Sequence, residues 1–302
     1  MSIQNFFINR FLMSRRAASL QLTPAQRLRQ GRKFLSRDYG KGRPDVAVRA
    51  DVIAGVPVEW VEPKTLSQDA RAPICVYLHG GGFIVGSLNS HRDMATHLAA
   101  MAQVRMLMVA YRLAPEHPFP AAHEDAMAVY QGLLARGVSP GQLLMGGDSA
   151  GGNLALATAQ AIRDAGLPQP RGLVLFSPWI DLTHQGDSIS TNESKDAMLH
   201  RQLLVDALAM YAPTALATHP KISPLLGNLS GLPPTLTVVS QSEILRDDAL
   251  RLHQLLQAAG GDSTCLQWQH TPHAFPVMAR LLPEARDALR QTAGFMARVL
   301  RG

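Results

Sequence analysis

From residue 74 onward, short apolar runs alternate with amphipathic stretches of helical length, and this alternation strongly limits the folds open to the chain. The predicted strands are Ile74–Leu78, Met106–Tyr111, Gln142–Met145, Gly172–Phe176, Thr235–Ser240 and Thr264–Gln269. The predicted helices are Asn89–Met101, Pro120–Ala135, Ala150–Ala165, Arg246–Ala259 and Glu284–Leu300. Repeated strand–helix units of this kind build a mostly parallel sheet with helices on both faces.

Two further strands precede these units. Val46–Ile53 and Val56–Val61 alternate apolar and polar residues around Ala54-Gly55, a pattern that predicts a hairpin. With this hairpin the sheet has about eight strands. We therefore expect an α/β fold, with one catalytic-size domain over residues 46–302.

Two regions stand outside the repeating pattern. The N-terminal region, residues 1–45, contains helix-compatible segments at Ile3–Ala18 and Pro24–Leu35 and ends at Gly40–Pro44. The segment Asp181–Ile222 has no strand signal but holds one helical pattern, His200–Met210. An insertion of this size commonly covers the strand ends, where ligands bind in open α/β sheets. We expect residues 182–222 to form such a cap and to meet residues 1–45 there.

Charge is spread unevenly along the 302 residues. The first 43 residues carry ten Lys or Arg against one acid, a net +9, while the rest of the chain carries −3. A basic arm can serve nucleic acid, an anionic membrane surface or targeting, or can simply be a solvated helix. No basic stripe interleaved with aromatic residues and no nucleic-acid motif occurs elsewhere, so we expect no nucleic-acid partner.

The sequence shows neither a membrane-spanning segment nor a secretory signal. No apolar run approaches the roughly 20 residues that cross a bilayer. Phe6–Leu20 lacks the apolar core of a secretory signal, so a cytoplasmic location is expected. The two cysteines, Cys75 and Cys265, fall in predicted strands without metal-ligand spacing, and we expect two free buried thiols.

The most informative motif is Gly147-Asp148-Ser149-Ala150-Gly151, between a predicted strand and an Ala-rich helix. A Gly-x-Ser-x-Gly turn in this position strains the serine backbone and presents its hydroxyl above the sheet edge. The helix behind it directs free N–H groups and a positive dipole end at developing negative charge. A purely structural glycine turn is the alternative. The strand–turn–helix context favours Ser149 as a nucleophile.

A glycine loop, His79-Gly80-Gly81-Gly82-Phe83, follows directly on the first parallel strand. Consecutive glycines let the backbone approach a substrate closely and expose N–H groups to it. A carbonyl attacked by Ser149 becomes an oxyanion, for which Gly81, Gly82 and Ala150 are the predicted backbone donors. A phosphate-binding loop is the rival, but the Lys-Ser/Thr that such a loop needs is missing.

A serine nucleophile needs a base, and eleven histidines are available. The order Ser…acid…His requires a base after the last strand, which favours His273 and leaves His270 as the alternative. The acid should follow the preceding strand, where Glu243, Asp247 and Asp248 are candidates. Glu243 comes soonest after the strand and is preferred, while the two aspartates can instead stabilise a helix N-terminus.

Taken together, the motifs resemble those of the hormone-sensitive-lipase-like family of α/β-hydrolase carboxylesterases, from roughly Val46 to the C-terminus. They are HGGGF at His79–Phe83, YRLAPEHPFPAA at Tyr111–Ala122, GDSAGG at Gly147–Gly152, SPW at Ser177–Trp179 and His-Ala-Phe at His273–Phe275. The resemblance implies an α/β-hydrolase fold with a cap built from the N-terminal helices and the segment before the acid-bearing strand. It makes the basic arm a lid, with its apolar face as a wall of the substrate pocket.

The resemblance also assigns roles: Ser149 as nucleophile, Glu243 as acid, His273 as base, and Gly81, Gly82 and Ala150 as oxyanion donors. The chain departs from the family pattern at two of its motifs. Ala274 replaces the family's usual glycine after the histidine, and Glu243 replaces the aspartate of the usual Asp-Pro-Leu-Arg-Asp. One extra methylene can still orient the imidazole if the loop adjusts.

The sequence thus predicts a serine carboxylesterase that hydrolyses short- to medium-chain carboxylic esters through an acyl-enzyme, without metal or organic cofactor. An amidase or acyltransferase with the same triad is one alternative, and a non-catalytic receptor of the same fold is another. A homodimer is left open. Phe83, Trp179, Met198 and Met210 are candidate pocket residues, although apolar residues at such spacing are more often plain core.

Overall fold

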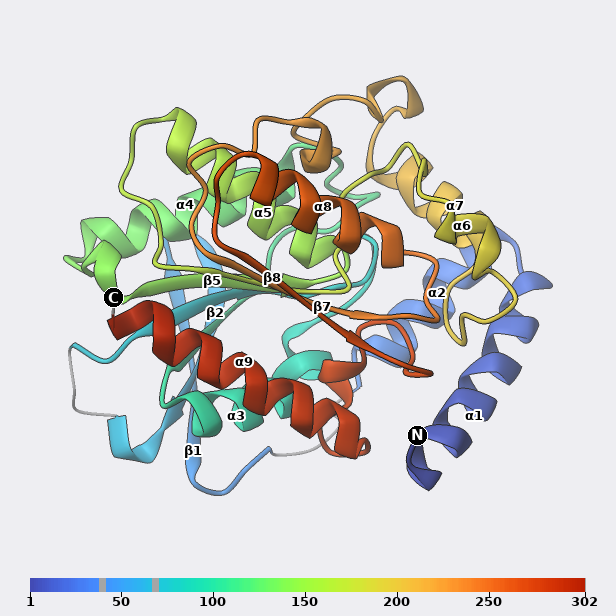
Figure 1. The fold of residues 1–302 in the computed structure, drawn as a ribbon, viewed down its shortest axis with the longest axis horizontal. Coiled ribbons are helices and arrows are strands. Elements are labelled where there is room, and N and C mark those ends of the chain that lie inside the picture. The colour runs from blue at the N-terminus through green and yellow to red at the C-terminus, as the bar shows by residue number, and fades with distance from the viewer. Residues whose placement is uncertain (38–41, 67–70, 302) are drawn as a thin grey trace.

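A single eight-stranded sheet forms the centre of the computed structural model, which describes residues 1–37, 42–66 and 71–301 (Figure 1). Its strands are β1 (Val46–Ile53), β2 (Val56–Pro63), β3 (Ile74–Leu78), β4 (Arg105–Val109), β5 (Leu143–Asp148), β6 (Leu173–Phe176), β7 (Thr235–Ser240) and β8 (Ser263–Trp268). They lie in the order β1-β2-β4-β3-β5-β6-β7-β8. The β1–β2 and β2–β4 pairs are antiparallel and all others are parallel. The predicted α/β fold and strand number are confirmed.

Helices cover both faces of this sheet (Figure 1). On one face lie α3 (Leu88–Ala102) and α9 (Pro283–Arg301), which pack against each other. On the other lie α4 (Ala121–Ala135), α5 (Ala150–Asp164) and α8 (Arg246–Ala258). Two apolar cores result, one on each side, as expected where parallel strands are sandwiched between helices.

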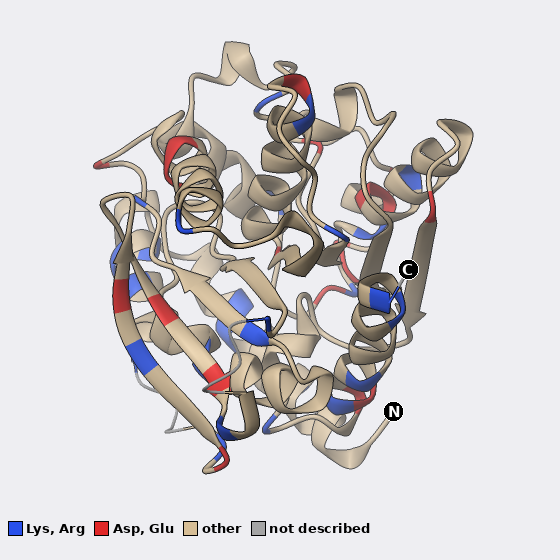
Figure 2. Cartoon of the chain, turned by 90° about the vertical axis from the view of Figure 1, so that its left-hand side faces the viewer, with Lys and Arg blue, Asp and Glu red and all other residues tan. Residues whose placement is uncertain are grey.

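Burial along the strands follows from their place in the sheet. Every residue of the central strands β3, β5, β6 and β7 is buried, which explains their uninterrupted apolar runs. Charged residues of both signs decorate the β1–β2 edge instead, where they discourage pairing with another chain (Figure 2). At the opposite edge, β8 is only half covered.

The two cysteines follow this difference between centre and edge. Both are free thiols, as predicted. Cys75 on β3 is fully buried, but Cys265 is only partly buried because β8 is an edge strand, so the expectation for Cys265 was wrong. Burial raises the pKa of Cys75 to about 12 and that of Cys265 to about 11, so neither is a reactive thiolate.

Two strands end at other residues than predicted, and both differences affect the loops around Ser149 and His79. β5 continues to Asp148, three residues beyond the predicted end, because Gly146 and Gly147 pair with β3 and β6 despite having no side chains. The strand therefore runs directly into Ser149. β4 ends at Val109, two residues early, and Tyr111 leaves the sheet to contact the loop after β3.

The regions outside the sheet are helical. The N-terminal region forms α1 (Ile3–Leu20) and α2 (Pro24–Leu35), and the insertion forms α6 (Ser188–Thr191) and α7 (Arg201–Tyr211). Residues 38–41 lie outside the described residues, so the predicted end of the N-terminal region at Gly40–Pro44 is described only from Gly42. Within the described part of the chain, no helix is long and apolar enough to cross a membrane.

Basic residues join the N-terminal region to the insertion. Arg16 of α1 donates to the carbonyls of Glu193 and Leu199 at 2.7 Å. Arg27 of α2 forms an ion pair with Asp206 of α7, and both side chains are about nine-tenths buried. The two regions therefore meet, as expected from the sequence, on the side of the sheet where α1 runs close to α6 (Figure 1).

Candidate active site

Ser149 stands at the sharp turn between β5 and α5. Its backbone is left-handed, with φ 51° and ψ −120°, and it is held by a 2.9 Å hydrogen bond from its amide to the carbonyl of Phe176. A Cβ on Gly151 would lie 1.9 Å from the carbonyl oxygen of Leu78, and one on Gly147 would lie 2.4 Å from that of Gly151. The turn can therefore close only with glycine at both positions, as the sequence motif indicates.

The glycine loop after β3 supplies free amides beside this turn. Gly81 and Gly82 have φ of 122° and 61°, and a Cβ on Gly81 would lie 2.2 Å from the carbonyl oxygen of Val85. Among the described residues, the amides of Gly81, Gly82 and Ala150 donate to no other group. Such unpaired backbone donors suit an oxyanion.

The loops after β7 and β8 bring an acid and a base together. His273 Nδ1 and the Glu243 carboxylate form a short hydrogen bond, and both side chains are buried. The other oxygen of Glu243 accepts from Ser177 Oγ at 2.7 Å and from the Ser240 amide at 2.8 Å. Ser177 Oγ in turn accepts from the Ala274 amide at 3.1 Å, so one hydroxyl links both loops. Ser177 belongs to the SPW motif, but the sequence alone assigns no role to its hydroxyl.

Electrostatics fix the state of the imidazole. Burial alone lowers the pKa of His273, but the charge and hydrogen bond of Glu243 outweigh it, and the net pKa lies above the usual 6.5. With Nδ1–H donated to Glu243, Nε2 is the nitrogen that can take a proton in the neutral ring. Ala274, in place of the family's glycine, has a left-handed backbone with φ 50°, the conformation that glycine adopts most easily.

The other candidates for acid and base are occupied elsewhere. Asp247 accepts from the Ser188 amide at 2.8 Å and pairs with Arg246. Asp248 is buried and accepts from two amides of the segment that leads into the insertion. His270 is exposed and lines the groove beside α1. Of the predicted acids and bases, the structure joins only Glu243 and His273.

A buried polar cluster that the sequence does not reveal lies next to Ser149. The carboxylate of Asp148, the residue before Ser149, accepts 3.0 Å hydrogen bonds from Tyr77 Oη and from the Gly80 amide. His91 Nε2 lies 3.1 Å from the same carboxylate. The sequence gives no signal for this pairing, because His91 and Asp148 lie 57 positions apart and only the folded chain brings them together. The cluster ties the serine turn directly to the glycine loop.

Within this cluster His91 and Asp148 are charged, whereas His79 is neutral. Burial opposes ionisation of both partners, yet pairing prevails: the pKa of His91 is raised and that of Asp148 is lowered. The neighbouring His79 is driven the other way, since burial and the nearby His91 charge lower its pKa to about 4. A His91–Asp148 ion pair with a neutral His79 therefore supports the loop.

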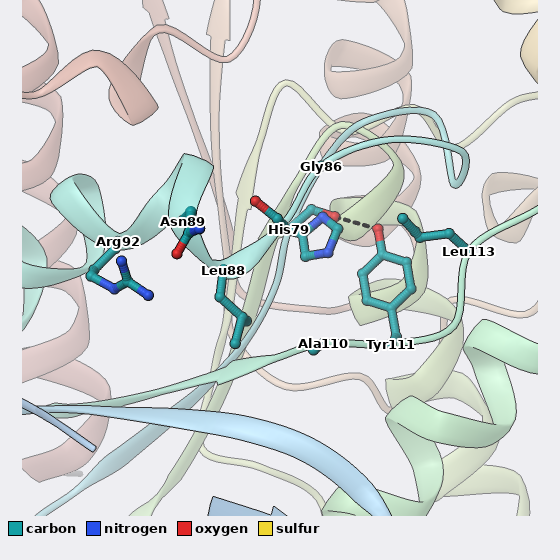
Figure 3. Close-up of a pocket in the computed structure, with 9 residues that line it drawn as sticks. His79, Gly86, Leu88, Asn89, Arg92, Ala110, Tyr111 and Leu113 are labelled. Atoms are coloured by element: carbon teal, nitrogen blue, oxygen red, sulfur yellow. Dashed lines mark hydrogen bonds between the residues drawn. The ribbon is translucent and has the colours of Figure 1, made fainter. Parts of the chain in front are cut away.

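His79 itself is held by the YRLAP segment. Figure 3 shows Tyr111 beside His79, with a 2.6 Å hydrogen bond from the Tyr111 hydroxyl to the His79 carbonyl. The two rings stack at 4.4 Å. The surrounding cavity of about 350 Å³ opens toward Arg92 and does not include Ser149 among its lining residues. His79, held by Tyr111 in this way, supports the glycine loop that follows it.

The insertion holds the acid loop in place. Asn192 Nδ2 donates to the carbonyls of Gln241 and Glu243 at 2.9 and 3.0 Å. The buried Asp196 carboxylate accepts from the Ile244 amide at 2.9 Å, and burial raises the pKa of Asp196. The acid loop is therefore fixed on both sides of Glu243 by residues that follow β6.

Aromatic rings fill the space above the glycine loop. Phe83 stacks on Tyr211 of α7 at 3.8 Å and lies 5.9 Å from Trp179, and all three rings are fully buried. Met198 and Met210, the other candidate pocket residues, are partly buried against the same core. Ala207 of α7 approaches so closely that a Cβ on Gly82 would lie 3.2 Å from its methyl group. The insertion thus presses directly on the glycine loop.

The pocket wall that the family resemblance assigns to the apolar face of α1 stays a prediction. Phe6 and Met13 line a groove of about 750 Å³ together with Lys195, Ser242 and His270. Neither Ser149 nor His273 lines this groove. Asn5 and Asn9 face the body of the protein, where both side chains donate to the His270 carbonyl. The polar side of α1 is therefore the one that faces inward.

Metal chemistry has no obvious ligand set in this site. Within residues 1–37, 42–66 and 71–301, no group of three or more His, Cys, Asp or Glu side chains is arranged to hold a metal ion. The fold joins the His273 imidazole to the Glu243 carboxylate and sets the glycine loop with its free amides against the strained turn of Ser149. This set of groups is suited to acyl transfer.

Comparison with known proteins agrees with this chemistry. The profile of a family described as having the alpha/beta hydrolase fold matches residues 75–277. An acetyl-hydrolase of Streptomyces hygroscopicus is 41% identical over 238 residues, which cover 79% of this chain and 78% of that protein. An esterase of Acinetobacter venetianus is 36% identical over 83% of this chain and 82% of its own length.

Solved structures give the same picture over nearly the whole chain. An esterase from the bacterial hormone-sensitive lipase family superposes with a TM-score of 0.91 at 36% identity and covers 99% of both chains. The esterase EstE5, in crystals soaked with p-nitrophenyl butyrate, superposes with a TM-score of 0.90 at 34% identity and covers 100% of both chains.

Proposed function

Since the chain belongs to the hormone-sensitive-lipase-like family of α/β-hydrolase carboxylesterases and is a carboxylic ester hydrolase, we propose that it acts through an acyl-enzyme formed on Ser149. The observation that carries this proposal is the short hydrogen bond between Glu243 and His273, two residues 30 positions apart, in loops that follow adjacent strands. A buried carboxylate–imidazole pair beside a serine turn has the chemistry of a nucleophile–base–acid triad.

In this proposal the hydroxyl of Ser149 attacks the ester carbonyl while Nε2 of His273 takes its proton. Glu243 keeps the proton of the neutral ring on Nδ1 and stabilises the imidazolium that forms. His273 then returns the proton to the departing alcohol, and water repeats the sequence to release the acid. The raised pKa of His273 supports its role as base near neutral pH.

The oxyanion of the tetrahedral intermediate is proposed to lie against the amides of Gly81, Gly82 and Ala150. Each donor of this type typically contributes about 3 kcal/mol to the transition state. Because Asp148, the residue before Ser149, accepts from the Gly80 amide, the proposed donors and the proposed nucleophile keep a fixed relation without rearranging.

We propose a preference for short to medium acyl chains, under a cap formed by residues 1–45 and 182–222. Its support is the crowding above the glycine loop, where Phe83, Trp179 and Tyr211 are fully buried and Ala207 touches Gly82. Rates measured along a series of p-nitrophenyl esters from acetate upward test it. The rate should fall beyond medium chains, and a rate that keeps rising with chain length would contradict the proposed preference.

Replacement of the nucleophile tests the mechanism. Ser149→Ala is expected to remove hydrolysis of p-nitrophenyl butyrate, because no other hydroxyl stands at the strained turn. Its fold should persist, since the Ser149 side chain makes no capping hydrogen bond. Thermal unfolding followed by circular dichroism checks the fold, with Ser190→Ala in the insertion as a matched exposed-serine control. Activity retained by a folded Ser149→Ala protein would refute the proposal.

A further inference from the structure

The first helix is turned with its apolar side toward solvent. Of the fourteen large apolar residues that are exposed in the described chain, half lie within the first 20 residues: Met1, Ile3, Phe6, Phe7, Phe11, Met13 and Leu20. Ile3 is 75% exposed, Phe7 63% and Phe11 55%, whereas the one fully buried residue of α1 is polar, Asn5. A helix that covered a core would show the reverse arrangement.

Cations accompany this face and acids are missing from it. Residues 1–37 contain eight Lys or Arg and no Asp or Glu. Arg10 lies on the same outer side and forms no ion pair with any described residue. Arg15 forms none either and lies over the rings of Phe11 and Phe34. By contrast, Arg16 and Arg27 are used internally to hold the insertion.

We propose that the outer face of α1, formed by Ile3, Phe6, Phe7, Arg10 and Phe11, docks on an anionic lipid surface. Exposed phenylalanines at a helix surface bury their rings in the interface between headgroups and acyl chains, and flanking arginines attract anionic headgroups. A large exposed apolar patch on an otherwise well-packed protein marks an interaction surface. The absence of acids favours a negatively charged partner.

A second copy of this chain fits the face less well. In a two-fold symmetric contact the same patch meets itself, so Arg10 and Arg15 of one copy would lie near those of the other without any acid between them. Desolvation and like-charge repulsion would both oppose that contact. A lipid surface offers apolar depth and opposite charge together.

Position supports the same conclusion. α1 lies at the edge of the molecule (Figure 1), and Phe6 and Arg10 of this face also line the 750 Å³ groove that Ser242 and His270 border. Ser242 is adjacent to the proposed acid Glu243, and His270 precedes the proposed base by three residues. Docking through α1 would therefore place the lipid surface beside the loops of the catalytic groups.

Vesicle sedimentation tests the proposal, with all variants built on Ser149→Ala so that no lipid is cleaved and the result does not depend on the proposed mechanism. Protein is mixed with vesicles of phosphatidylcholine alone or of equal parts phosphatidylcholine and phosphatidylglycerol. Binding is expected to be at least about tenfold stronger to the anionic vesicles and to weaken in about 1 M salt, where the Debye length is about 3 Å.

Substitutions on α1 then locate the surface. Phe7→Ser with Phe11→Ser should weaken partitioning by about tenfold or more. Arg10→Gln with Arg15→Gln should weaken it by about fivefold for each arginine. The matched controls are Leu255→Ser with Leu281→Ser, and Arg290→Gln with Arg298→Gln, all exposed and away from α1. These controls should bind as the parent does.

Several outcomes would overturn the proposal. They are absence of binding, equal binding to both vesicle types, or equal losses in the control pairs. A concentration-dependent dimer in sedimentation velocity that Phe7→Ser with Phe11→Ser abolishes, without vesicle binding by the parent, would assign the face to a second copy instead. Circular dichroism spectra and thermal unfolding curves that match the parent's establish that the α1 variants are folded.

Discussion

Glu243 stands where the family pattern has aspartate. The surroundings of its side chain explain why the longer glutamate is accepted. One carboxylate oxygen binds His273, while the other is fixed by Ser177 and by the Ser240 amide. The extra methylene is therefore absorbed inside a fully bonded carboxylate. Its negative charge remains beside the imidazole, where it raises the pKa of His273.

The charge of Glu243 should be visible in the pH profile. Hydrolysis needs neutral His273, so kcat/KM should fall as pH drops through a pKa above 6.5. Glu243→Gln removes the charge that raises this pKa, so the acidic limb should move to lower pH. At the same time the plateau should fall by roughly 10³- to 10⁴-fold, because the tautomer is no longer fixed.

Profiles of kcat/KM against pH for p-nitrophenyl butyrate check both effects, with Asp247→Asn as the matched control. Asp247 faces the insertion and not His273, so its variant should keep the parent's acidic limb. A limb that shifts for Asp247→Asn but not for Glu243→Gln would transfer the role of acid to Asp247.

At the scale of elements, the β5–α5 turn and the β3 loop are packed so closely that glycine is required. Gly151 begins the first turn of α5 directly against the Leu78 carbonyl. This contact brings the nucleophile turn beside the glycine loop, which makes it a condition for the site as well as for the fold.

A glycine-to-alanine substitution in each of two helices distinguishes the effect of this close packing from the effect of helix propensity. Gly151→Ala places a methyl group 1.9 Å from the Leu78 oxygen and should cost at least about 3 kcal/mol of unfolding free energy, with loss of activity. Gly294→Ala lies in α9 with nothing within 4 Å of the new methyl and should stabilise the protein by about 1 kcal/mol. Urea unfolding measures both, and a Gly151→Ala protein of parental stability and activity would contradict the close packing.

At the scale of the whole molecule, the sheet and the insertion depend on each other at the acid loop. Asn192 sits at the end of α6 and binds carbonyls on either side of Ser242, while Asp196 binds the amide after Glu243. The insertion thus helps to hold the loop that carries the proposed acid.

Loss of this support should reduce both stability and turnover. Asn192→Ala leaves the buried Glu243 carbonyl and the partly buried Gln241 carbonyl without their donor and should cost about 2 kcal/mol. The same substitution should lower kcat by about tenfold or more, because the Glu243 loop is no longer held in register. The exposed neighbour Thr191→Ala should stay within about 0.5 kcal/mol of the parent. A stable Asn192→Ala protein with unchanged kcat would show that the insertion does not position the acid.

Sequence patterns predicted most of the sheet and the pairing of Glu243 with His273. Strand and helix periodicity is local, and the order of the motifs along the chain indicated which loops carry these two residues. They could not supply His91 or Asn192, whose partners lie 57 and 51 positions away, across contacts that only the folded chain creates. Nor could they orient α1. Its spacing predicts a helix, but the inward turn of Asn5 depends on the His270 carbonyl, a partner 265 residues distant.

The central claim, that Ser149 is the nucleophile activated by His273, is tested most directly by labelling with a fluorophosphonate and mapping the adduct by peptide mass spectrometry. The account predicts a single adduct on Ser149, formed in parallel with loss of esterase activity and strongly slowed in a folded His273→Ala protein. An adduct on another residue, or full inactivation with Ser149 unmodified, would contradict it.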